Sequence, residues 1–509
     1  MFRFSDVLTK AARQWPDCPA VSWPDGSVTW AQLAARAGAL ADALAARGVK
    51  TGDRVAYLGF NGISGVETLF AAPLIGAAAV PLNYRLADGE LIDMLNDCRP
   101  TAVIVDATHT DMLARLLPSC PSVKVVLSEA PLDGMEDLAQ ARDTATPADR
   151  RPSGGDEMLV IFYTGGTTGR SKGVMLSHTN IYSNAMGILA NWDISEATPY
   201  AMTGPLFHSA AGARMYGAAF TGQHVVMQPN FDIEGLLRLI ERHRIEIAQF
   251  VPTMIAMILD HPAFGRYDTS SLRMITYGAA PMPPALLART MKAFPGVKFG
   301  QAFGMTEASP ILTLLNPEDH DEPTSPRLHS VGRPVPFVDM VALGEDGTPL
   351  PPNEIGELAA RGANIMLGYW DQPDLTAEVL KDGWYHTGDA GYMDEDGYFY
   401  VSGRIKDMII TGGENVYPIE VEQVLSHHPA VRAVAVIGSP DDKWGERVHA
   451  VLEPVPGQSV SADDLIAYCR DRLAHYKCPS RVTFWDGELP LTKVNKIDKV
   501  ALRAAIAGK

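Results

Sequence analysis

Short apolar runs alternate with helix-like segments over about the first 300 residues of the chain. The helix-like segments carry apolar residues at helical spacing, and one of them, Thr29–Gly48, ends at a glycine typical of a C-cap. Strands that alternate with helices join into parallel sheets, so this order predicts a mostly parallel α/β fold. The expected strands include Asp53–Phe60, Thr101–Asp106, Val123–Ser128, Gln223–Met227, Ile245–Val251, Met274–Tyr277 and Lys298–Ala302.

The pattern changes twice further along the chain. From about Pro334, short strand-like runs separated by DG, PP and NE turns indicate an antiparallel, barrel-like β piece. After Gly403–Pro418, further strand-like runs and helices at Pro418–Ser426 and Asp463–Leu473 indicate a small α+β domain. A chain of 509 residues is too long for one core. We therefore expect a large N-terminal domain, residues 1–403, and a small C-terminal domain, residues 404–509.

Composition excludes several classes of protein. The net charge of −17 disfavours a general surface for nucleic acid or anionic membranes. The five cysteines show no CxxC pairing, which predicts reduced thiols in a cytoplasmic protein. The N-terminus has no signal-like apolar region, and no apolar stretch is long enough to predict a membrane span. The oligomeric state stays open, with a homodimer as one alternative.

A run rich in glycine and threonine, YTGGTTGRSKGV (Tyr163–Val174), lies between strand-like flanks. Glycines allow close approach of the backbone to a ligand, and backbone N–H groups, hydroxyls and cations together bind anions. A polyphosphate is therefore the expected guest. The run is not a Walker A loop, because Ser171 and not glycine precedes Lys172. The alternative is a flexible surface turn.

A second motif, QAFGMTEASP, spans Gln301–Pro310. The Glu307 carboxylate suits Mg²⁺, a hard cation that takes carboxylate and phosphate oxygens. Thr306 can donate a hydrogen bond to a phosphate oxygen, and Phe303 can stack on a base. The alternative is an ordinary helix start.

Three later motifs are weaker when each is taken alone. In YHTGDAG, a glycine-flanked turn presents Asp389, whose carboxylate suits a ribose diol, although an Asx-turn is the alternative. In GRIKDMIITGGENVYPIEVE, Arg404 can act as a fork donor and the GG turn can bend around an extended ligand, the alternative being a solvated hairpin. In the basic loop Leu489–Arg503, Lys496 can carry a charge into a site, or the loop is a solvated lysine run.

The order of these motifs is more specific than any one of them. A Thr/Gly loop, FGMTE, HTGD, GRIKD and a late lysine, in this order, resemble the adenylate-forming superfamily, which includes acyl-CoA synthetases, peptide-synthetase adenylation domains and firefly-type luciferases. The resemblance covers nearly the whole chain. It is closest to acyl-CoA synthetases, since GGENVYPIEVE is similar to their CoA-facing segment. It implies that a carboxylate attacks the α-phosphate of Mg-ATP, and that the CoA thiol then displaces AMP.

The resemblance also implies which residues contact ATP. The Thr/Gly loop would hold the β- and γ-phosphates, Phe303 and the turn after Tyr277 would flank adenine, and two later residues would hold the ribose. In chain order these ATP contacts are Thr164, Gly165, Gly166, Thr167, Thr168, Gly169, Lys172, Gly278, Ala279, Ala280, Phe303, Asp389 and Arg404.

The same resemblance implies the catalytic and mobile parts. Lys496 would bridge the carboxylate and the α-phosphate, Thr306 would contact the α-phosphate, and Glu307 would bind magnesium. The small domain would then swing about Lys406, remove Lys496 and bring a second set of residues towards CoA. That set is Gly412, Gly413, Glu414 and Asn415. Lys443, Arg447 and Lys477 are candidates for the CoA phosphates, and each is equally well a surface charge.

The implied acyl pocket consists of small or apolar residues, which favours a fatty or aryl acid over an amino acid. Its expected walls are His208, Val251, Met254, Gly300, Ala302 and Gly304. His208 is counted among the catalytic candidates as well, although a lone histidine in such a setting is more often structural or a pocket wall. Arg214 is expected to be a solvated or salt-bridged helix residue. If it pointed inward, a dicarboxylate such as malonate would become the substrate.

Four positions depart from the superfamily pattern. Gly165 stands where the loop usually has serine, and Ser171 where it has proline. Phe303 replaces the usual tyrosine, which keeps a stacking face but loses a hydroxyl. Asn495 replaces the glycine before the late lysine, and asparagine tolerates left-handed backbone better than most residues.

Three rival functions remain beside an acyl-CoA synthetase. A ligase that loads a carrier protein would not need CoA to release AMP. A luciferase-like oxygenase would consume O₂ after adenylation. A catalytically silent nucleotide-binding protein would be expected to lack Lys496 or Glu307, and both are present.

Overall fold

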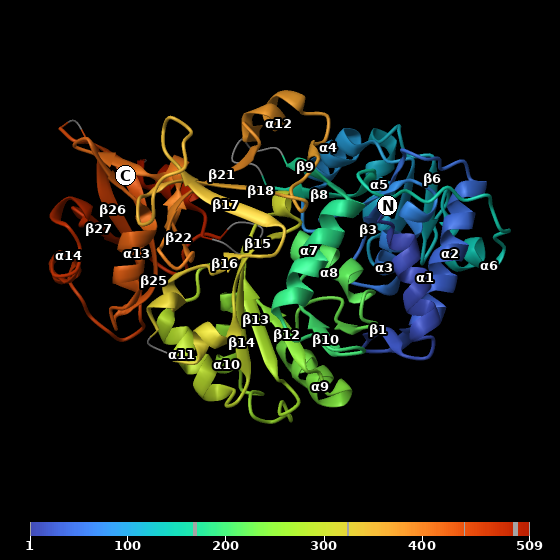
Figure 1. The fold of residues 1–509 in the computed structure, drawn as a ribbon, viewed down its shortest axis with the longest axis horizontal. Coiled ribbons are helices and arrows are strands. Elements are labelled where there is room, and N and C mark those ends of the chain that lie inside the picture. The colour runs from blue at the N-terminus through green and yellow to red at the C-terminus, as the bar shows by residue number, and fades with distance from the viewer. Residues whose placement is uncertain (1, 166–170, 323–324, 442, 492–496, 508–509) are drawn as a thin grey trace.

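Four β-sheets and the helices that cover them make up the fold (Figure 1). The computed structural model describes residues 2–165, 171–322, 325–441, 443–491 and 497–507. The expected residues Gly166, Thr167, Thr168, Gly169 and Lys496 lie outside these ranges.

The sheet nearest the N-terminus has eight strands in the order β19-β9-β8-β4-β3-β5-β6-β7. Its strands from β8 to β7 run parallel, and β9 and β19 are added antiparallel at one edge. Its strands are β3 (Arg54–Leu58), β4 (Ala78–Leu82), β5 (Ala102–Val105), β6 (Val125–Ser128), β7 (Glu136–Asp137), β8 (Met158–Thr164), β9 (Lys172–Ser177) and β19 (Gly368–Tyr369).

A second sheet has nine strands in the order β16-β15-β14-β13-β12-β10-β11-β1-β2. The strands from β14 to β1 are parallel and the outer ones antiparallel, so the predicted mostly parallel sheets are confirmed. Its strands are β1 (Pro19–Trp23), β2 (Gly26–Thr29), β10 (Pro199–Met202), β11 (His224–Met227), β12 (Ile247–Phe250), β13 (Met274–Gly278), β14 (Lys298–Gly304), β15 (Ile311–Leu315) and β16 (Arg333–Pro334).

Helices connect and cover these strands. The predicted helix at Thr29–Gly48 is α2, Trp30–Ala46, and its start is set by a capping box in which the Thr29 hydroxyl accepts from Gln32 N. Gly48 follows with a φ of 89°, a conformation that favours glycine. The other helices of this part are α1 (Phe4–Gln14), α3 (Ile63–Leu74), α4 (Asp88–Cys98), α5 (Thr110–Leu116), α6 (Leu138–Asp143), α7 (His178–Asn191), α8 (Ser209–Ala218), α9 (Ile233–His243), α10 (Pro252–Asp260), α11 (Pro284–Ala293) and α12 (Pro373–Val379).

One hydrophobic core joins the two large sheets. It combines residues of β3 and β8 with residues of β10, β12 and β13, and α3, α7 and α8 contribute apolar side chains between them. Figure 1 shows α7 and α8 in the middle of the molecule, between strands of the two sheets. Residues on α8 are therefore enclosed on both sides.

Two smaller sheets follow. The first orders β17-β18-β21-β20 with β22 beside β21, and all its pairs are antiparallel, which confirms the expected β piece. The second orders β24-β23-β26-β25 with β27 beside β26. These strands are β17 (Val338–Leu343), β18 (Gly356–Gly362), β20 (Leu380–Lys381), β21 (Trp384–Met393), β22 (Phe399–Arg404), β23 (Ile409–Thr411), β24 (Glu414–Val416), β25 (Val431–Asp441), β26 (Gly445–Pro454) and β27 (Arg481–Phe484).

The C-terminal sheet packs with helices around a core of its own, which confirms the expected α+β character of this region. The second of its helices begins and ends within three residues of the predicted bounds. The helices are α13 (Pro418–Ser426), α14 (Ala462–Arg470) and α15 (Lys499–Ala507). Short 3₁₀ turns are η1 (Leu117–Ser119), η2 (Thr306–Ala308), η3 (Pro317–His320), η4 (Pro326–His329), η5 (Ile405–Asp407) and η6 (His475–Lys477).

All five cysteines are free thiols. Among the described residues, no helix is both long and apolar enough to cross a membrane.

Several histidines are buried as neutral rings, among them His178 and His224. His178 accepts from Phe4 N at its Nδ1 (3.2 Å), and its Nε2 lies 2.9 Å from Ser153 Oγ. Burial lowers the pKa of His178 to about 4, and burial likewise lowers the pKa of His224 to about 4. The unfolded chain thus binds protons near pH 6.5 that the folded chain binds only near pH 4. The contribution of these histidines to stability is therefore complete above pH 6.5, their pKa in the unfolded chain, and is lost as the pH falls from there towards pH 4.

We expect the melting temperature, measured at one fixed scan rate, to fall between pH 7.5 and pH 5. Each buried histidine should lower the free energy of unfolding by up to about 1.4 kcal/mol for each pH unit within this window, and the melting temperature should fall with it. His178→Gln should flatten this dependence, whereas the control His427→Gln, at an exposed position, should leave it unchanged. Equal slopes in wild type and His178→Gln would contradict the prediction.

Candidate active site

The glycine-rich run connects two adjacent strands, as predicted. β8 and β9 pair antiparallel, so that Thr164 at the end of one strand lies opposite Lys172 at the start of the other. The end of β8 is anchored by Tyr163, whose hydroxyl donates to the Asp97 carboxylate. The described ends of the loop, Thr164 and Gly165, are partly buried and exposed, respectively.

Lys172 and Glu307 both contact the side chain of Tyr369, one at its ring and the other at its hydroxyl. The Lys172 ammonium lies 5.2 Å from the centroid of the Tyr369 ring, and the Tyr369 hydroxyl donates to Glu307 Oε1 (2.9 Å). Burial raises the pKa of Tyr369, and the negative charge of Glu307 raises it further. Lys172 of the glycine-rich run and the expected magnesium ligand Glu307 therefore belong to one cluster.

The TE motif forms a short 3₁₀ turn, η2, and not the start of an α-helix. The Thr306 hydroxyl is buried and lies 3.0 Å from the hydroxyl of Ser209, the first residue of α8. Just before the turn, an ideal Cβ on Gly304 would lie 1.9 Å from Pro310 O. Only glycine lets β14 and β15 approach so closely here.

The expected adenine-binding residues lie at the ends of β13 and β14. Gly278 pairs with Ala302, and an ideal Cβ on Gly278 would lie 2.3 Å from Ala302 O. Ala279 has a φ of 64°, an unusual conformation for alanine, and Ala280 follows it. Phe303 packs its ring against the core of the barrel-like piece. This geometry forms a tight turn beside a partly buried aromatic ring.

Asp389 lies within strand β21 and not in a turn, which corrects the sequence prediction. The strand pairs Asp389 with Arg404 of β22, and the two side chains form an ion pair of 2.6 Å. The preceding Gly388 has a φ of 70°, so a glycine-centred distortion inside a strand mimicked a turn signal.

Tyr385 is buried near these charged groups. Burial raises the pKa of its hydroxyl, and the charges of Glu307 and Asp389 raise it further while Arg404 lowers it. The pKa of Lys406 in η5 also responds to burial and to these neighbouring charges. Burial lowers its pKa, Asp407 opposes this shift, and the positive charges of Arg404 and Lys172 add to it. The predicted phosphate, metal, ribose and hinge residues thus share one electrostatic environment.

The expected CoA-facing residues form an exposed hairpin turn. Thr411 of β23 pairs with Glu414 of β24, and Gly412 and Gly413 between them have φ values of 62° and 86°. The predicted hairpin alternative therefore describes the backbone, and all residues from Gly412 to Asn415 are exposed. The CoA role itself stays a prediction.

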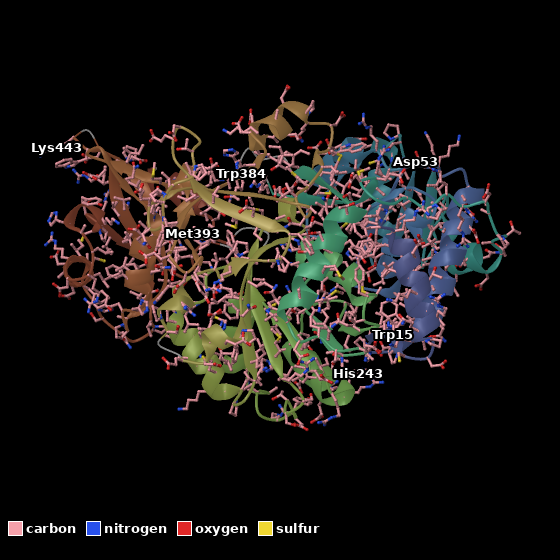
Figure 2. The ribbon with its side chains drawn as sticks, in the orientation of Figure 1. Trp15, Asp53, His243, Trp384, Met393 and Lys443 are labelled. Carbon is pink, nitrogen blue, oxygen red and sulfur yellow. The ribbon has the colours of Figure 1, made fainter. Side chains whose placement is uncertain are left out.

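The three basic candidates for the CoA phosphates have partners in this structure. Arg447 pairs with Asp441 and Lys477 with Glu420. The Lys443 ammonium lies 4.7 Å from the centroid of the Trp444 ring, and Figure 2 shows Lys443 at the outer edge of the C-terminal region.

The expected acyl residues surround the carboxyl end of the larger sheet. Gly300, Ala302 and Gly304 alternate along β14 and so share one face of it. Val251 precedes α10 and Met254 lies in its first turn, at the end of the nearby strand β12. His208 is the N-cap of α8 and accepts from Ala210 N (3.3 Å), which supports the structural interpretation of this histidine.

Arg214 is buried, which corrects the expectation of a solvated or salt-bridged residue. Its side chain lies in α8 with 8% of the residue exposed, and the guanidinium carbon is 5.0 Å from the centroid of the Tyr200 ring. Among the described residues, Arg214 forms no ion pair with a carboxylate within 4.0 Å. The small and alanine-rich neighbourhood of Arg214 in the sequence gave no sign of this burial.

The residues fit a magnesium ion held mainly by its nucleotide. The described residues contain no group of three or more His, Cys, Asp or Glu side chains that could hold a metal ion. Mg²⁺ commonly binds through one or two carboxylates together with substrate phosphates and waters. Glu307, close to Lys172 through Tyr369, is a carboxylate of this kind.

Tyr369, Tyr385 and Ser209 contact or adjoin the site and were missed from the sequence. Tyr369 is followed by Trp370 and a polar turn, a context that gives no chemical signal. Pairing of β19 with β9 is what brings Tyr369 beside Lys172.

Comparison with known proteins matches nearly all of the chain. A family profile described as AMP-binding enzyme matches residues 8–370, and the AMP-binding enzyme C-terminal domain matches residues 420–496. Feruloyl-CoA synthase from Amycolatopsis sp. is 41% identical over 495 residues, covering 97% of each chain. Indoleacetate–CoA ligase from Aromatoleum aromaticum is 36% identical and covers 99% of this chain and 98% of its own. The amide bond synthetase McbA from Marinactinospora thermotolerans has a similar structure (TM-score 0.89, 32% identity, 99% of each chain).

Proposed function

The chain belongs to the AMP-binding enzyme family, and from this membership we propose that it is an AMP-forming acid–thiol ligase that joins a hydrophobic carboxylic acid to CoA. One observation carries the proposal. Lys172, Glu307, Asp389 and Arg404 come from distant parts of the chain, yet they gather around Tyr369 and Tyr385. Cations and a carboxylate at one place suit a bound magnesium nucleotide.

The proposed reaction has two half-reactions. A carboxylate oxygen of the acid bonds to the α-phosphorus of ATP, and pyrophosphate leaves with the electrons of the broken P–O bond. The CoA sulfur then bonds to the acyl carbon, AMP leaves, and the thiol proton passes to solvent. Both steps need positioning and charge neutralisation more than covalent help from the protein.

The chain's own residues divide these tasks. Lys172 and the loop after Thr164 bind the β- and γ-phosphates, with Gly166, Thr167, Thr168 and Gly169 as the further loop contacts. Thr306, held by the Ser209 hydroxyl, donates to the α-phosphate. Glu307 holds Mg²⁺, which when bound neutralises phosphate charge. Lys496 neutralises the carboxylate and α-phosphate as they approach.

Adenosine binding uses the ends of three strands. The turn from Gly278 to Ala280 and the ring of Phe303 flank adenine. Asp389 accepts from the ribose hydroxyls, and its ion pair with Arg404 (2.6 Å) keeps the carboxylate oriented.

A domain rotation separates the two steps in this proposal. We place the boundary after residue 403 and the hinge at Lys406, since β22 ends at Arg404 and the C-terminal sheet begins at Ile409. Rotation would withdraw Lys496 and bring Gly412, Gly413, Glu414 and Asn415 to CoA. Such alternation protects a reactive adenylate from water before it admits the thiol.

The test is pyrophosphate release with ATP, Mg²⁺ and single acids, with and without CoA. Cinnamic, 4-methylcinnamic, benzoic, octanoic and malonic acids span the aryl, fatty and dicarboxylate classes. We expect release that depends on an aryl or fatty acid, and an acyl-CoA product only when CoA is added.

Other outcomes point to the alternatives. Turnover with malonate alone would favour a dicarboxylate ligase. AMP release that needs a carrier protein or an amine and not CoA would identify a different acyl acceptor. No acid-dependent release with any acid would contradict the proposed function.

A further inference from the structure

Arg214 differs from the partly buried arginines of this protein that pair with buried carboxylates. Arg142 pairs with the fully buried Glu67, which Arg36 also contacts, and Arg150 forms a bidentate pair with Asp42. Arg214 is more deeply buried than these arginines, but its Nη1 has no hydrogen-bond partner in the part of the chain that the structure describes. A guanidinium carries donors only, so Nη1 needs an acceptor that the described residues do not supply.

Tyr200 compensates the charge of Arg214 only in part, and no carboxylate of the described residues lies within 4.0 Å of it. The Tyr200 ring offers a cation–π contact at 5.0 Å, and the Tyr200 hydroxyl donates to Gln249 Oε1 (2.6 Å). A cation held in a dry interior without a counter-charge is unfavourable, and a ring face offsets only part of that cost. Burial lowers the pKa of Arg214 accordingly. The folded protein therefore retains this arginine at a cost to its stability.

The position of Arg214 relates it to the acyl region. Helix α8 begins at Ser209, whose hydroxyl contacts Thr306, and His208 caps it. Arg214 comes six residues after His208, which is about 9 Å along a helix that rises 1.5 Å per residue. The backbone of Arg214 thus lies further along α8 than the residues at the start of the helix, beside which the acid would react.

A second buried donor is on the same face of the sheet. Gln249 of β12, Thr276 of β13 and Gly300 of β14 are in register, and residues in register on parallel strands share a face. An ideal Cβ on Gly300 would lie 3.2 Å from Trp192 Nε1, a buried donor that also has no hydrogen-bond partner among the described residues. This face therefore combines small residues with donors that lack acceptors, which is unusual in a protein interior.

We propose that Arg214 binds an oxygen acceptor at the far end of the acid substrate, so that the enzyme prefers carboxylic acids bearing a distal carboxylate, hydroxyl or ether oxygen over purely apolar acids. This inference rests on the proposed ligase function and deepens it by naming the substrate class. An anionic oxygen would both complete the hydrogen bonding of Nη1 and neutralise the buried cation. The roughly 9 Å offset along α8 favours a substrate of cinnamate length over one as short as malonate.

Matched acids test this inference in the wild-type enzyme first. We compare kcat/KM for pyrophosphate release with 4-methylcinnamate, 4-hydroxycinnamate, 4-methoxycinnamate and 4-carboxycinnamate, and with octanoate against octanedioate. Acids with the distal oxygen should be preferred by about 10- to 100-fold, the range for a hydrogen bond to a charged group. If only the acid with a distal carboxylate is preferred, the site selects for negative charge. If the acids with a distal hydroxyl or ether are preferred equally, the site selects for any oxygen acceptor.

Variants then assign the preference to Arg214. In Arg214→Met, the ratio of kcat/KM for acids with the distal oxygen to kcat/KM for acids without it should fall to near one, while 4-methylcinnamate keeps its kcat/KM. Arg214→Lys should restore part of the preference. The control Arg242→Met, at an exposed arginine of α9, should keep the wild-type ratio.

The outcomes separate this inference from the proposed function. A wild-type ratio near one, or a ratio unchanged in Arg214→Met, would overturn the role of Arg214 although the ligase still works. Failure of every acid in the wild type would overturn the ligase function and the inference with it. If Arg214→Met does not fold, the wild-type ratio and Arg214→Lys still decide the question.

Discussion

Replacing Lys496 by alanine should lower acid-dependent pyrophosphate release by about 100- to 1,000-fold, the range for loss of one charge-stabilising group. The reaction of a supplied acyl-adenylate with CoA should be nearly unaffected. The physical reason is that a carboxylate and a phosphate repel each other as they approach, whereas a thiol attacking an adenylate meets no such barrier. Pyrophosphate release and acyl-CoA formation from synthetic acyl-adenylate measure the two steps separately.

Lys499→Ala is the matched control. It removes a lysine of the same basic segment whose ammonium pairs with Glu422 (2.7 Å), so both half-reactions should continue. An equal loss of both steps in Lys496→Ala would show that the alternating use of the C-terminal domain is wrong. Because Lys496 lies outside the described residues, this prediction depends on the order of the sequence motifs alone.

Glu307→Gln should lower kcat/KM for ATP by about 100- to 1,000-fold and raise the Mg²⁺ concentration needed for half-maximal rate. Glutamine keeps the size of the side chain and an oxygen that can accept from the Tyr369 hydroxyl, so the substitution mainly removes the negative charge. The measurement is a Mg²⁺ titration of pyrophosphate release at fixed ATP.

Tyr369→Phe provides the comparison for Glu307→Gln. It removes the hydrogen bond to Glu307 but keeps the ring that lies 5.2 Å from the Lys172 ammonium. Its effect should stay within about tenfold, since a hydrogen bond to a charged group contributes about 1.5–3 kcal/mol and water can replace part of it. An unchanged Mg²⁺ requirement in Glu307→Gln would show that this carboxylate does not bind the metal.

Local chemistry explains why much of the fold could be predicted. Helix α2 begins at Thr29 because the threonine caps it, and the chain leaves the helix near Gly48. The strand at Val125–Ser128 is apolar and buried, as a parallel strand covered on both faces has to be. These signals lie within a few residues of one another, so the sequence alone expresses them.

The predictions for Asp389 and Arg214 were wrong because contacts between remote parts of the chain decide where these residues lie. Asp389 was assigned to a turn because glycines flank it, but pairing with β22 holds it in a strand opposite Arg404. The sequence predicts a solvated or salt-bridged Arg214, but α8 is enclosed between the two large sheets. In both cases the decisive neighbour is remote in sequence.

The sequence by itself determined the alternation of strands and helices, the family resemblance and the residue types proposed for phosphate, metal and ribose binding, because capping, periodicity and motif chemistry act over short distances. Only the tertiary structure decided that Tyr369 lies between Lys172 and Glu307 and that Arg214 is buried without a carboxylate. Pairing of β19 with β9 and the packing of α8 between two sheets produce these contacts. Strand pairing and burial depend on the whole chain, and no local pattern encodes them.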